Sequence, residues 1–281
     1  MLRFAKARTH QGLSMVRTTL NILGNLLDAR MRPTMVQKVR RRLLRLIQER
    51  EPGAMGWAAE RATDHAVLCE ALNPSLWQET QDYVRTFREE AAKKLAGAPA
   101  MGGGGNYHLL YFLTRFLRPE NVLETGVAAG YSTHAVLSAL EKNGTGRLYS
   151  SEFPYFRLSD PMRYVGILVP DDLKRRWTLG LEGDSVAVPK FLERLSGGID
   201  LFHYDSDKTY AGRKETFQKV RPHLSSRAVV LVDDIQDNYH FRDLVKQGEF
   251  ENRVFGFEGK YCGLLERRGG PFLSLQRRAV G

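Results

Sequence analysis

Short apolar runs alternate with longer amphipathic segments in the second half of the chain. The predicted strands lie at 121–125, 147–151, 177–181, 199–204 and 228–232, and the predicted helices at 107–117, 132–142, 188–195 and 212–224. Strands that alternate with helices predict an α/β, Rossmann-like fold with a mostly parallel sheet, whose ligands bind at the carboxyl ends of the strands. Apolar positions between 250 and 265 indicate two final strands, which bring the sheet to seven and give it an antiparallel edge.

The first hundred residues show helical spacing interrupted by prolines and no strand pattern. They end in four glycines, 102–105, which form either a plain flexible linker or a loop over a ligand. The sequence therefore predicts a basic helical extension with a glycine-rich linker at 1–105, followed by one domain at 106–281.

The positive charge of the protein is concentrated near its N-terminus. Residues 1–50 hold twelve Lys and Arg against Asp28 and Glu49, which gives +10, the net charge of the whole protein. From Thr34 to Glu49 apolar residues recur at helical spacing, with basic residues mostly on the other side. We expect this helix to dock its apolar stripe on the body of the protein. An anionic membrane surface and an acidic partner are alternatives, and nucleic acid is less favoured.

Composition excludes several other classes of protein. Hydrophobic residues make up 42% and charged residues 26% of the chain, as in globular proteins. No apolar run reaches the roughly 20 residues of a membrane-spanning helix. The two cysteines, Cys69 and Cys262, form neither a disulfide framework nor a zinc motif, so we expect a reducing, cytoplasmic location. The sequence leaves a homo-oligomer open.

A small-residue turn follows the first predicted strand, in the run from Glu124 to Ser132. Gly126, Ala128 and Gly130 allow a tight turn that approaches a ligand, and the next helix begins near Ser132. The turn lacks the GxGxxG spacing of nicotinamide-dependent oxidoreductases, which remain a less favoured alternative. Glu124 would repel a phosphate but suits a positively charged ligand such as S-adenosylmethionine.

This acidic-x-Gly-x-x-x-Gly run resembles the first motif of class I S-adenosylmethionine-dependent methyltransferases. The resemblance implies that Glu152, at the end of the second strand, binds the ribose hydroxyls. It also implies that Asp184 and Ser185, after the third strand, contact adenine. The implied cofactor-binding residues are Glu124, Gly126, Ala128, Gly130, Ser132, Glu152, Asp184 and Ser185.

Carboxylates follow the two next strands. Asp205 ends one strand, while Asp233 and Asp234 end its expected neighbour, so the three side chains should meet at the carboxyl edge of the sheet. A hard divalent cation such as Mg²⁺ would neutralise them. The alternative is that one aspartate caps a helix and another pairs with an arginine.

These segments resemble the metal-dependent catechol and caffeoyl-coenzyme-A O-methyltransferases. Over about residues 106–267 the chain looks closer still to the methyltransferase type 24 family, which commonly has His where Lys208 stands here. The resemblance implies metal-assisted O-methylation of a small molecule such as a sugar, a natural product or an aromatic acceptor.

The expected mechanism aligns a substrate hydroxyl with the methyl group of the cofactor. A metal on Asp205, Asp233 and Asp234 would acidify the hydroxyl, and Lys208 would take its proton. His203, His240 and Tyr210 are alternative proton acceptors, although a lone strand histidine is more often a packed core residue. The insert at 153–176 would cover the site. A non-catalytic adenosylmethionine-binding protein that acts through its basic N-terminal arm is the second hypothesis.

Overall fold

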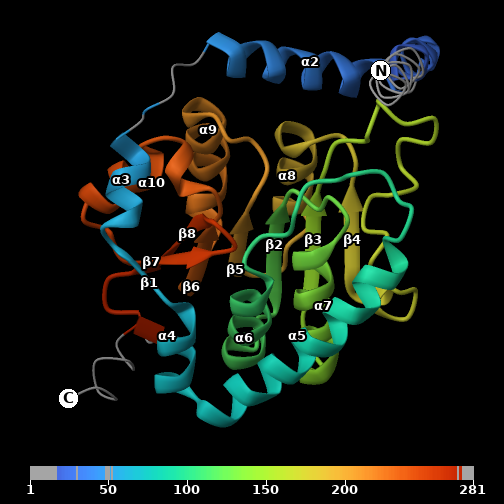
Figure 1. The fold of residues 1–281 in the computed structure, drawn as a ribbon. Coiled ribbons are helices and arrows are strands. Elements are labelled where there is room, and N and C mark those ends of the chain that lie inside the picture. Colours follow the sequence, from blue (N-terminus) through green and yellow to red (C-terminus); the bar gives the residue numbers. More distant parts are fainter. Residues whose placement is uncertain (1–17, 30, 48–50, 52, 271, 274–281) are drawn as a thin grey trace, which may run out of the picture.

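An eight-stranded sheet forms the centre of the molecule (Figure 1). The computed structural model describes residues 18–29, 31–47, 51, 53–270 and 272–273. The strand order is β1-β7-β8-β6-β5-β2-β3-β4. The strands are β1 (Ala62–Thr63), β2 (Asn121–Thr125), β3 (Arg147–Ser151), β4 (Trp177–Gly180), β5 (Ile199–Tyr204), β6 (Leu224–Val232), β7 (Phe250–Phe257) and β8 (Lys260–Arg267).

The α/β class, the mostly parallel sheet and its antiparallel strands at one side are confirmed, and the number of strands differs by one. The predicted antiparallel strands are β7 and β8, and β8 lies between β6 and β7 and is antiparallel to both. The two-residue strand β1, from the part of the chain predicted to contain no strand, pairs with β7 and raises the number of strands to eight.

Helices cover both faces of the sheet. They are α2 (Arg32–Ile47), α3 (Gly53–Ala59), α4 (His65–Leu72), α5 (Pro74–Lys94), α6 (Tyr107–Leu117), α7 (Tyr131–Asn143), α8 (Asp184–Leu192), α9 (Tyr210–Val220) and α10 (His240–Lys246). Buried residues of α4–α7 share one core cluster with Val122 and Leu201, while those of α8–α10 share another with Leu123 and Phe202. Successive strand residues thus point to opposite faces, as the pleat requires.

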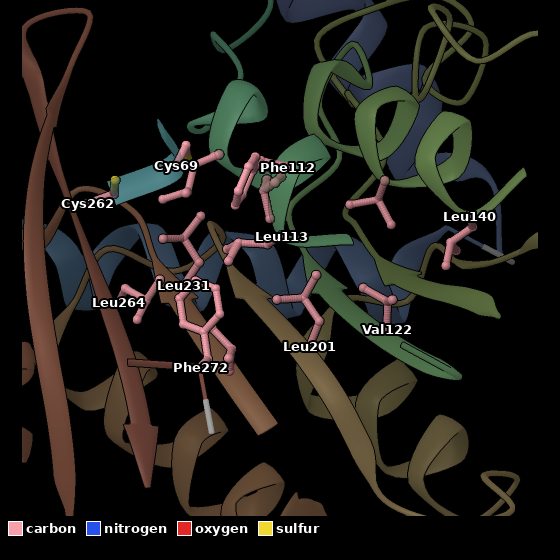
Figure 2. Packing of buried hydrophobic residues seen from close by; sticks show 14 of the residues in the cluster. Cys69, Phe112, Leu113, Val122, Leu140, Leu201, Leu231, Cys262, Leu264 and Phe272 are labelled. Carbon is pink, nitrogen blue, oxygen red and sulfur yellow. The ribbon is translucent and has the colours of Figure 1, made fainter. Parts of the chain in front are cut away.

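The N-terminal helices α4 and α5 take part in the main core. Figure 2 shows Cys69 of α4 packed near Phe112 of α6 and Cys262 of β8, above the strand residues Leu231 and Leu264. Leu68 and Trp77 belong to the same cluster. These helices are therefore part of the packing that stabilises this face of the sheet.

The basic helix α2 runs across the carboxyl ends of the central strands, at the top of Figure 1. Our expectation that it docks through an apolar stripe holds for Met35, which is buried, but not for Val36, Val39 and Leu43, which are exposed. Its polar contacts with the body are made by Gln37, Lys38 and Arg41. Among the described residues, none of the helices combines the length and apolar character that a bilayer crossing requires.

Candidate active site

The turn between β2 and α7 has the backbone conformation that its small residues predict. Gly126 and Gly130 have φ angles of 89° and 97°, and Ala128 adopts the left-handed region with φ 48°. A Cβ atom on Gly126 would overlap the carbonyl oxygen of Asp205. Glycine is therefore required at position 126 both for its dihedral angle and for the close approach of the β5 end.

Glu152 holds this turn from the end of β3. Its Oε2 accepts hydrogen bonds from the backbone N–H groups of Val127 (2.9 Å) and Ala128 (2.8 Å), and its Oε1 accepts one from Phe153 (2.7 Å). Burial raises the pKa of Glu152, and these backbone donors oppose that shift. The carboxylate thus lies beside the glycine turn, at the edge where the resemblance expects the ribose contact.

Glu124 has a different environment from the one expected for a cofactor contact. Its side chain is fully buried, and it accepts hydrogen bonds of 2.7 Å from the hydroxyls of Ser132, Thr133 and Ser150. These donors come from α7 and β3, so the carboxylate fastens both elements to β2. In this arrangement Glu124 and Ser132 position the turn and face each other.

Asp184 and Ser185 lie at the start of α8, under the basic helix. Asp184 accepts hydrogen bonds from Ser151 Oγ (2.7 Å) and Ser206 Oγ (2.6 Å), and Arg41 of α2 lies 3.1 Å from its Oδ2. Ser185 Oγ donates to Gln37 Oε1 of α2 at 3.1 Å. Helix α2 therefore contacts both residues of the predicted adenine site.

A cleft of about 660 Å³ opens between α2, α8 and α9. Its lining includes Gln37, Arg41, Ser185, Asp207 and Tyr210. The volume is within the range of small-molecule sites, which is about 300–1,000 Å³.

Asp205, Asp233 and Asp234 do converge at the carboxyl edge, and cations of the chain itself accompany them. Lys208 Nζ contacts Asp205 Oδ1 and lies 2.8 Å from Asp234 Oδ2. Lys260 Nζ approaches the other oxygen of Asp234 at 3.4 Å. Lys208 therefore links two of the three carboxylates that the sequence assigned to a metal.

The charge state of Lys208 follows from these neighbours. Burial lowers its pKa, but attraction by Asp205 and Asp234 outweighs burial and raises the pKa above its ordinary value. Burial raises the pKa of Asp234, yet Lys208 and Lys260 bring it to about 2. Lys208 is thus an ammonium that donates hydrogen bonds, and it needs a change of surroundings before it can accept a proton.

His203 belongs to the cluster formed by Asp205, Asp233 and Lys208. From the sequence, a lone histidine on a strand is more readily interpreted as a packed core residue. In the structure, His203 Nε2 donates to Asp233 Oδ2 at 2.8 Å, and its Nδ1 lies 3.4 Å from Glu124 Oε1. Burial lowers its pKa, but the hydrogen bonds and charges of Asp233 and Glu124 raise the value to about 10. The signal that could have found it is its register in β5, which pairs His203 with Glu124 of β2.

The other two proposed proton acceptors, Tyr210 and His240, lie at the starts of helices α9 and α10. His240 is buried at the start of α10, and burial lowers its pKa to about 4. The Tyr210 hydroxyl donates to Asp243 Oδ2 at 3.2 Å. Their rings contact each other edge to face, with centroids 5.4 Å apart.

A divalent cation fits this cluster only after its hydrogen bonds rearrange. His203, Asp205 and Asp233 each offer one donor atom, and these atoms lie within 4.8 Å of one another. However, Asp205 is paired with Lys208, and His203 carries a proton bonded to Asp233. A metal-binding histidine must be neutral, so metal binding would release that proton and separate Lys208 from Asp205.

The glycine run approaches this cluster closely. A Cβ atom on Gly105 would overlap Asp233 Oδ2 and lie 2.8 Å from His203 Nε2, and one on Gly104 would overlap Tyr131. Around Gly103, by contrast, a Cβ would meet nothing within 4 Å. The backbone of Gly104 and Gly105 therefore packs closely, with Gly105 directly against Asp233 and His203.

The insert at 153–176 covers the glycine turn. The N–H groups of Gly166 and Leu168 donate to the carbonyl oxygens of Ala128 (2.9 Å) and Ala129 (3.0 Å). A Cβ on Gly130 would lie 3.0 Å from Gly166 Cα, so this glycine serves the approach of the insert. The predicted cover over the carboxyl edge is formed by both the insert and α2.

Comparison with known proteins agrees with this geometry. Residues 123–235, which span the predicted cofactor-binding residues, Lys208 and the three aspartates, match the Methyltransf_24 family, a methyltransferase domain. No curated protein sequence matches the chain. The class I S-adenosylmethionine-dependent methyltransferase fold and its likeness to the type 24 family are thereby confirmed.

Several solved structures resemble this chain at 15–16% sequence identity. Cofactor-bound Rv0187 from MTB is 16% identical, with a TM-score of 0.50 over 64% of this chain and 88% of that one. A caffeoyl-CoA O-methyltransferase candidate from Staphylococcus aureus is 15% identical, with a TM-score of 0.50 over 67% and 99%. An O-methyltransferase from Bacillus cereus in complex with SAH is 16% identical, with a TM-score of 0.47 over 69% and 91%.

Residues 123–235 form a methyltransferase domain within the mostly parallel sheet. The chain thus carries a methyltransferase domain, with N-terminal helices added to its sheet.

Proposed function

We propose that this protein transfers the methyl group of S-adenosylmethionine to a hydroxyl of a small molecule. The observation that carries the proposal is the convergence of a glycine turn held by Glu152 with the cluster of Asp205, Lys208, Asp233 and His203. The first feature suits the cofactor and the second suits a hydroxyl that must lose a proton. The solved O-methyltransferases with the same fold support the choice of oxygen as acceptor.

The cofactor is proposed to lie along the carboxyl edge from the Gly126 turn to Asp184. The Val127 and Ala128 N–H groups and the Glu152 carboxylate would face its ribose, and Asp184 with Ser185 would face adenine. Arg41 and Gln37 of α2 already contact these two residues, so cofactor entry involves this helix.

Lys208 and its carboxylates would act on the acceptor. In-line methyl transfer requires chiefly that the hydroxyl be aligned and deprotonated. The Lys208 ammonium stabilises developing negative charge on the acceptor oxygen, and Asp205 is the carboxylate placed to receive the proton. Burial raises the pKa of Asp205 above its ordinary value, against the opposing effect of Lys208, which makes it a stronger base than an exposed aspartate.

Metal assistance is the second candidate for this step, and the proximity of three donor atoms favours it. The ion would be held by His203, Asp205 and Asp233, whereas Asp234 stays with Lys208 and Lys260. A bound divalent cation supplies Lewis-acid acidification of the acceptor hydroxyl. Because one donor is an imidazole, Mn²⁺ is expected to compete well with Mg²⁺.

The proposal also concerns where the enzyme works. Cys69 and Cys262 are both buried free thiols, and burial raises the pKa of each. Thiols kept in the core agree with a reducing compartment, so we place the protein in the cytoplasm.

A screen with methyl-labelled S-adenosylmethionine tests the proposed function. Hydroxyl-bearing sugars, aromatics and natural products are incubated with the wild type, with and without a chelator. Asp205→Asn should lower turnover about 100-fold or more while the cofactor Kd changes less than about twofold. Asp171→Asn, a change at an exposed aspartate of the insert, is the matched control.

The outcomes separate the candidates. Loss of turnover in chelator, with rescue by Mn²⁺ or Mg²⁺, selects the metal-assisted reaction, and unchanged turnover selects Lys208 with Asp205. If Asp205→Asn weakens cofactor binding as much as turnover, its proposed role is contradicted. Tight cofactor binding with no labelled product across the screen favours a non-catalytic protein that acts through its basic N-terminal arm.

A further inference from the structure

The two most N-terminal described helices pack against the protein through polar side chains. In the helix at 18–27, Asn21 Nδ2 donates to the carbonyl of Arg157 (3.0 Å), and Asn25 Nδ2 donates to those of Phe156 (3.0 Å) and Leu158 (3.1 Å). The two asparagines are one helical turn apart and therefore share the inward face. This helix contacts the insert through amides, not through its leucines.

Helix α2 continues the same arrangement. Lys38 Nζ donates to the carbonyl of Pro154 at 2.8 Å and lies 5.3 Å from the ring centroid of Tyr155. Arg41 pairs with Asp184 at 3.1 Å and approaches Asp207 at 3.7 Å. Basic side chains of α2 thus point at the body of the protein.

Several apolar side chains of both helices face outward as a consequence, although Met35 of α2 is buried. Leu20, Leu23 and Leu27 are 63%, 51% and 77% exposed, and they share one face because they are three, four and seven residues apart. On α2 the exposed fractions are 61% for Val36, 52% for Val39 and 56% for Leu43, at the same spacing. We call these six residues the outer apolar face.

Such a face is unfavourable in water, since apolar surface is normally buried against the body of the protein. Here the inward positions are taken by Met35 and by polar residues with specific partners, so rotation of either helix would break those contacts. Among the described residues nothing buries the outer apolar face, so it is positioned to bury its side chains in a surface beyond them.

The positive charge of the N-terminal segment indicates which kind of partner binds the outer apolar face. Residues 1–50 carry a net charge of +10, and the exposed Arg32 and Arg40 flank the apolar positions of α2. Two copies of this chain docked through the face would bring two such segments together, which is electrostatically unfavourable. A basic helix with an exposed apolar stripe matches an anionic lipid surface, which offers both negative charge and an apolar interior.

We propose that the outer apolar face docks on an anionic membrane surface, with both helices lying in the plane of the interface. Because α2 crosses the carboxyl ends of the strands, docking turns that edge of the sheet towards the lipid (Figure 1). The cleft lined by Gln37 and Arg41 then lies next to the bilayer. The proposal rests on the packing of these helices and is independent of the methyl acceptor.

Vesicle flotation of the full chain tests this docking. The probe is vesicles of phosphatidylcholine mixed with phosphatidylglycerol, compared with vesicles of phosphatidylcholine alone. The double variant Val39→Asp/Leu43→Asp should weaken binding to the anionic vesicles by about tenfold or more, and Arg40→Glu should weaken it without removing any apolar residue. Val67→Asp is the matched control, because Val67 is 65% exposed on α4, outside the outer apolar face.

The expected result is binding that requires phosphatidylglycerol, weakens at high salt and survives Val67→Asp. Circular dichroism and the thermal midpoint of each variant show whether it is folded. Equal flotation of the double variant and the wild type, or no flotation of either, would overturn the proposal. The proposal would also be overturned if light scattering showed that the wild type is a dimer and the double variant a monomer. It would likewise be overturned if both proteins bound RNA equally and neither bound vesicles.

Discussion

His203 connects the two halves of the candidate site, since it contacts Asp233 on one side and Glu124 on the other. All three side chains are buried. Removal of the imidazole would leave two buried carboxylates without their shared cation, which is more costly than loss of an exposed ion pair. The histidine is therefore expected to matter for stability as well as for the reaction.

We predict that His203→Gln lowers the free energy of unfolding by about 3–5 kcal/mol at pH 7. The pKa of His203 is raised from 6.5 to about 10 in the folded protein, so its stabilisation is complete below pH 6.5 and is lost as pH rises through about 10. Thermal unfolding from pH 7 to 10 should therefore show a fall in wild-type stability that is smaller in the variant. Equal pH dependence of the two proteins would contradict the assignment of His203 as a buried cation.

At the scale of elements, the glycine run is a segment whose function depends on close packing. Gly105 is buried against Asp233 and His203, whereas Gly103 is exposed. The residue types alone left a flexible linker and a loop over a ligand equally open. Contacts across about a hundred residues of sequence decide between them.

We predict that Gly105→Ala displaces the His203–Asp233 pair and that Gly103→Ala does not. The added methyl group of the first variant should cost roughly 1–3 kcal/mol of stability, measured by chemical denaturation. The second variant is the matched control, with an expected change within about 0.5 kcal/mol. If both variants unfold at the same denaturant concentration as the wild type, the run is not packed over the cluster.

Elements with a clear period were predictable from the sequence, and their long-range contacts were not. The bounds of β2, β3, β5 and α6 agree with the predicted ranges because apolar runs and helical spacing define them locally. The position of β8 between β6 and β7 depends on which edges meet, which no local pattern encodes. The orientation of α2 depends on Asp184, 143 residues away, so its exposed apolar side could not be anticipated.

In the candidate site, too, the positions of residues were predictable from the sequence, whereas their side-chain contacts were not. The meeting of Asp205 with Asp233 and Asp234 followed from parallel strands that end at one edge. Their internal neutralisation by Lys208 and His203 did not follow, because it depends on side-chain directions. The sequence likewise predicts that Glu124 contacts the cofactor. In the structure it accepts hydrogen bonds from Ser132 of α7 and Ser150 of β3 instead.

At the scale of the whole molecule, helices α4 and α5 share a core cluster with the sheet. Leu68 of α4 is 2% exposed in the cluster that includes Leu110, Val229 and Leu264. We infer that this part of the 1–105 extension unfolds together with the domain at 106–281, although the sequence divides them.

Leu68→Ala tests that inference. The cavity left by the leucine should cost about 2–5 kcal/mol and shift a single unfolding transition seen by both tryptophan fluorescence and far-UV circular dichroism. The matched control is Val67→Ala on the same helix, where the side chain is 65% exposed and the expected change is within about 0.5 kcal/mol. A separate early transition confined to the variant would mean that the extension unfolds independently.

The central claim is that the turn held by Glu152 binds S-adenosylmethionine, and calorimetric titration of the full chain tests it most directly. The account predicts one cofactor molecule per chain, with a Kd that rises about 10- to 100-fold in Glu152→Ala. Glu182→Ala, a change at an exposed carboxylate paired with Lys190, should leave the Kd unchanged. Absence of heat from the wild type, or equal affinity of the wild type and a folded Glu152→Ala variant, would contradict the account.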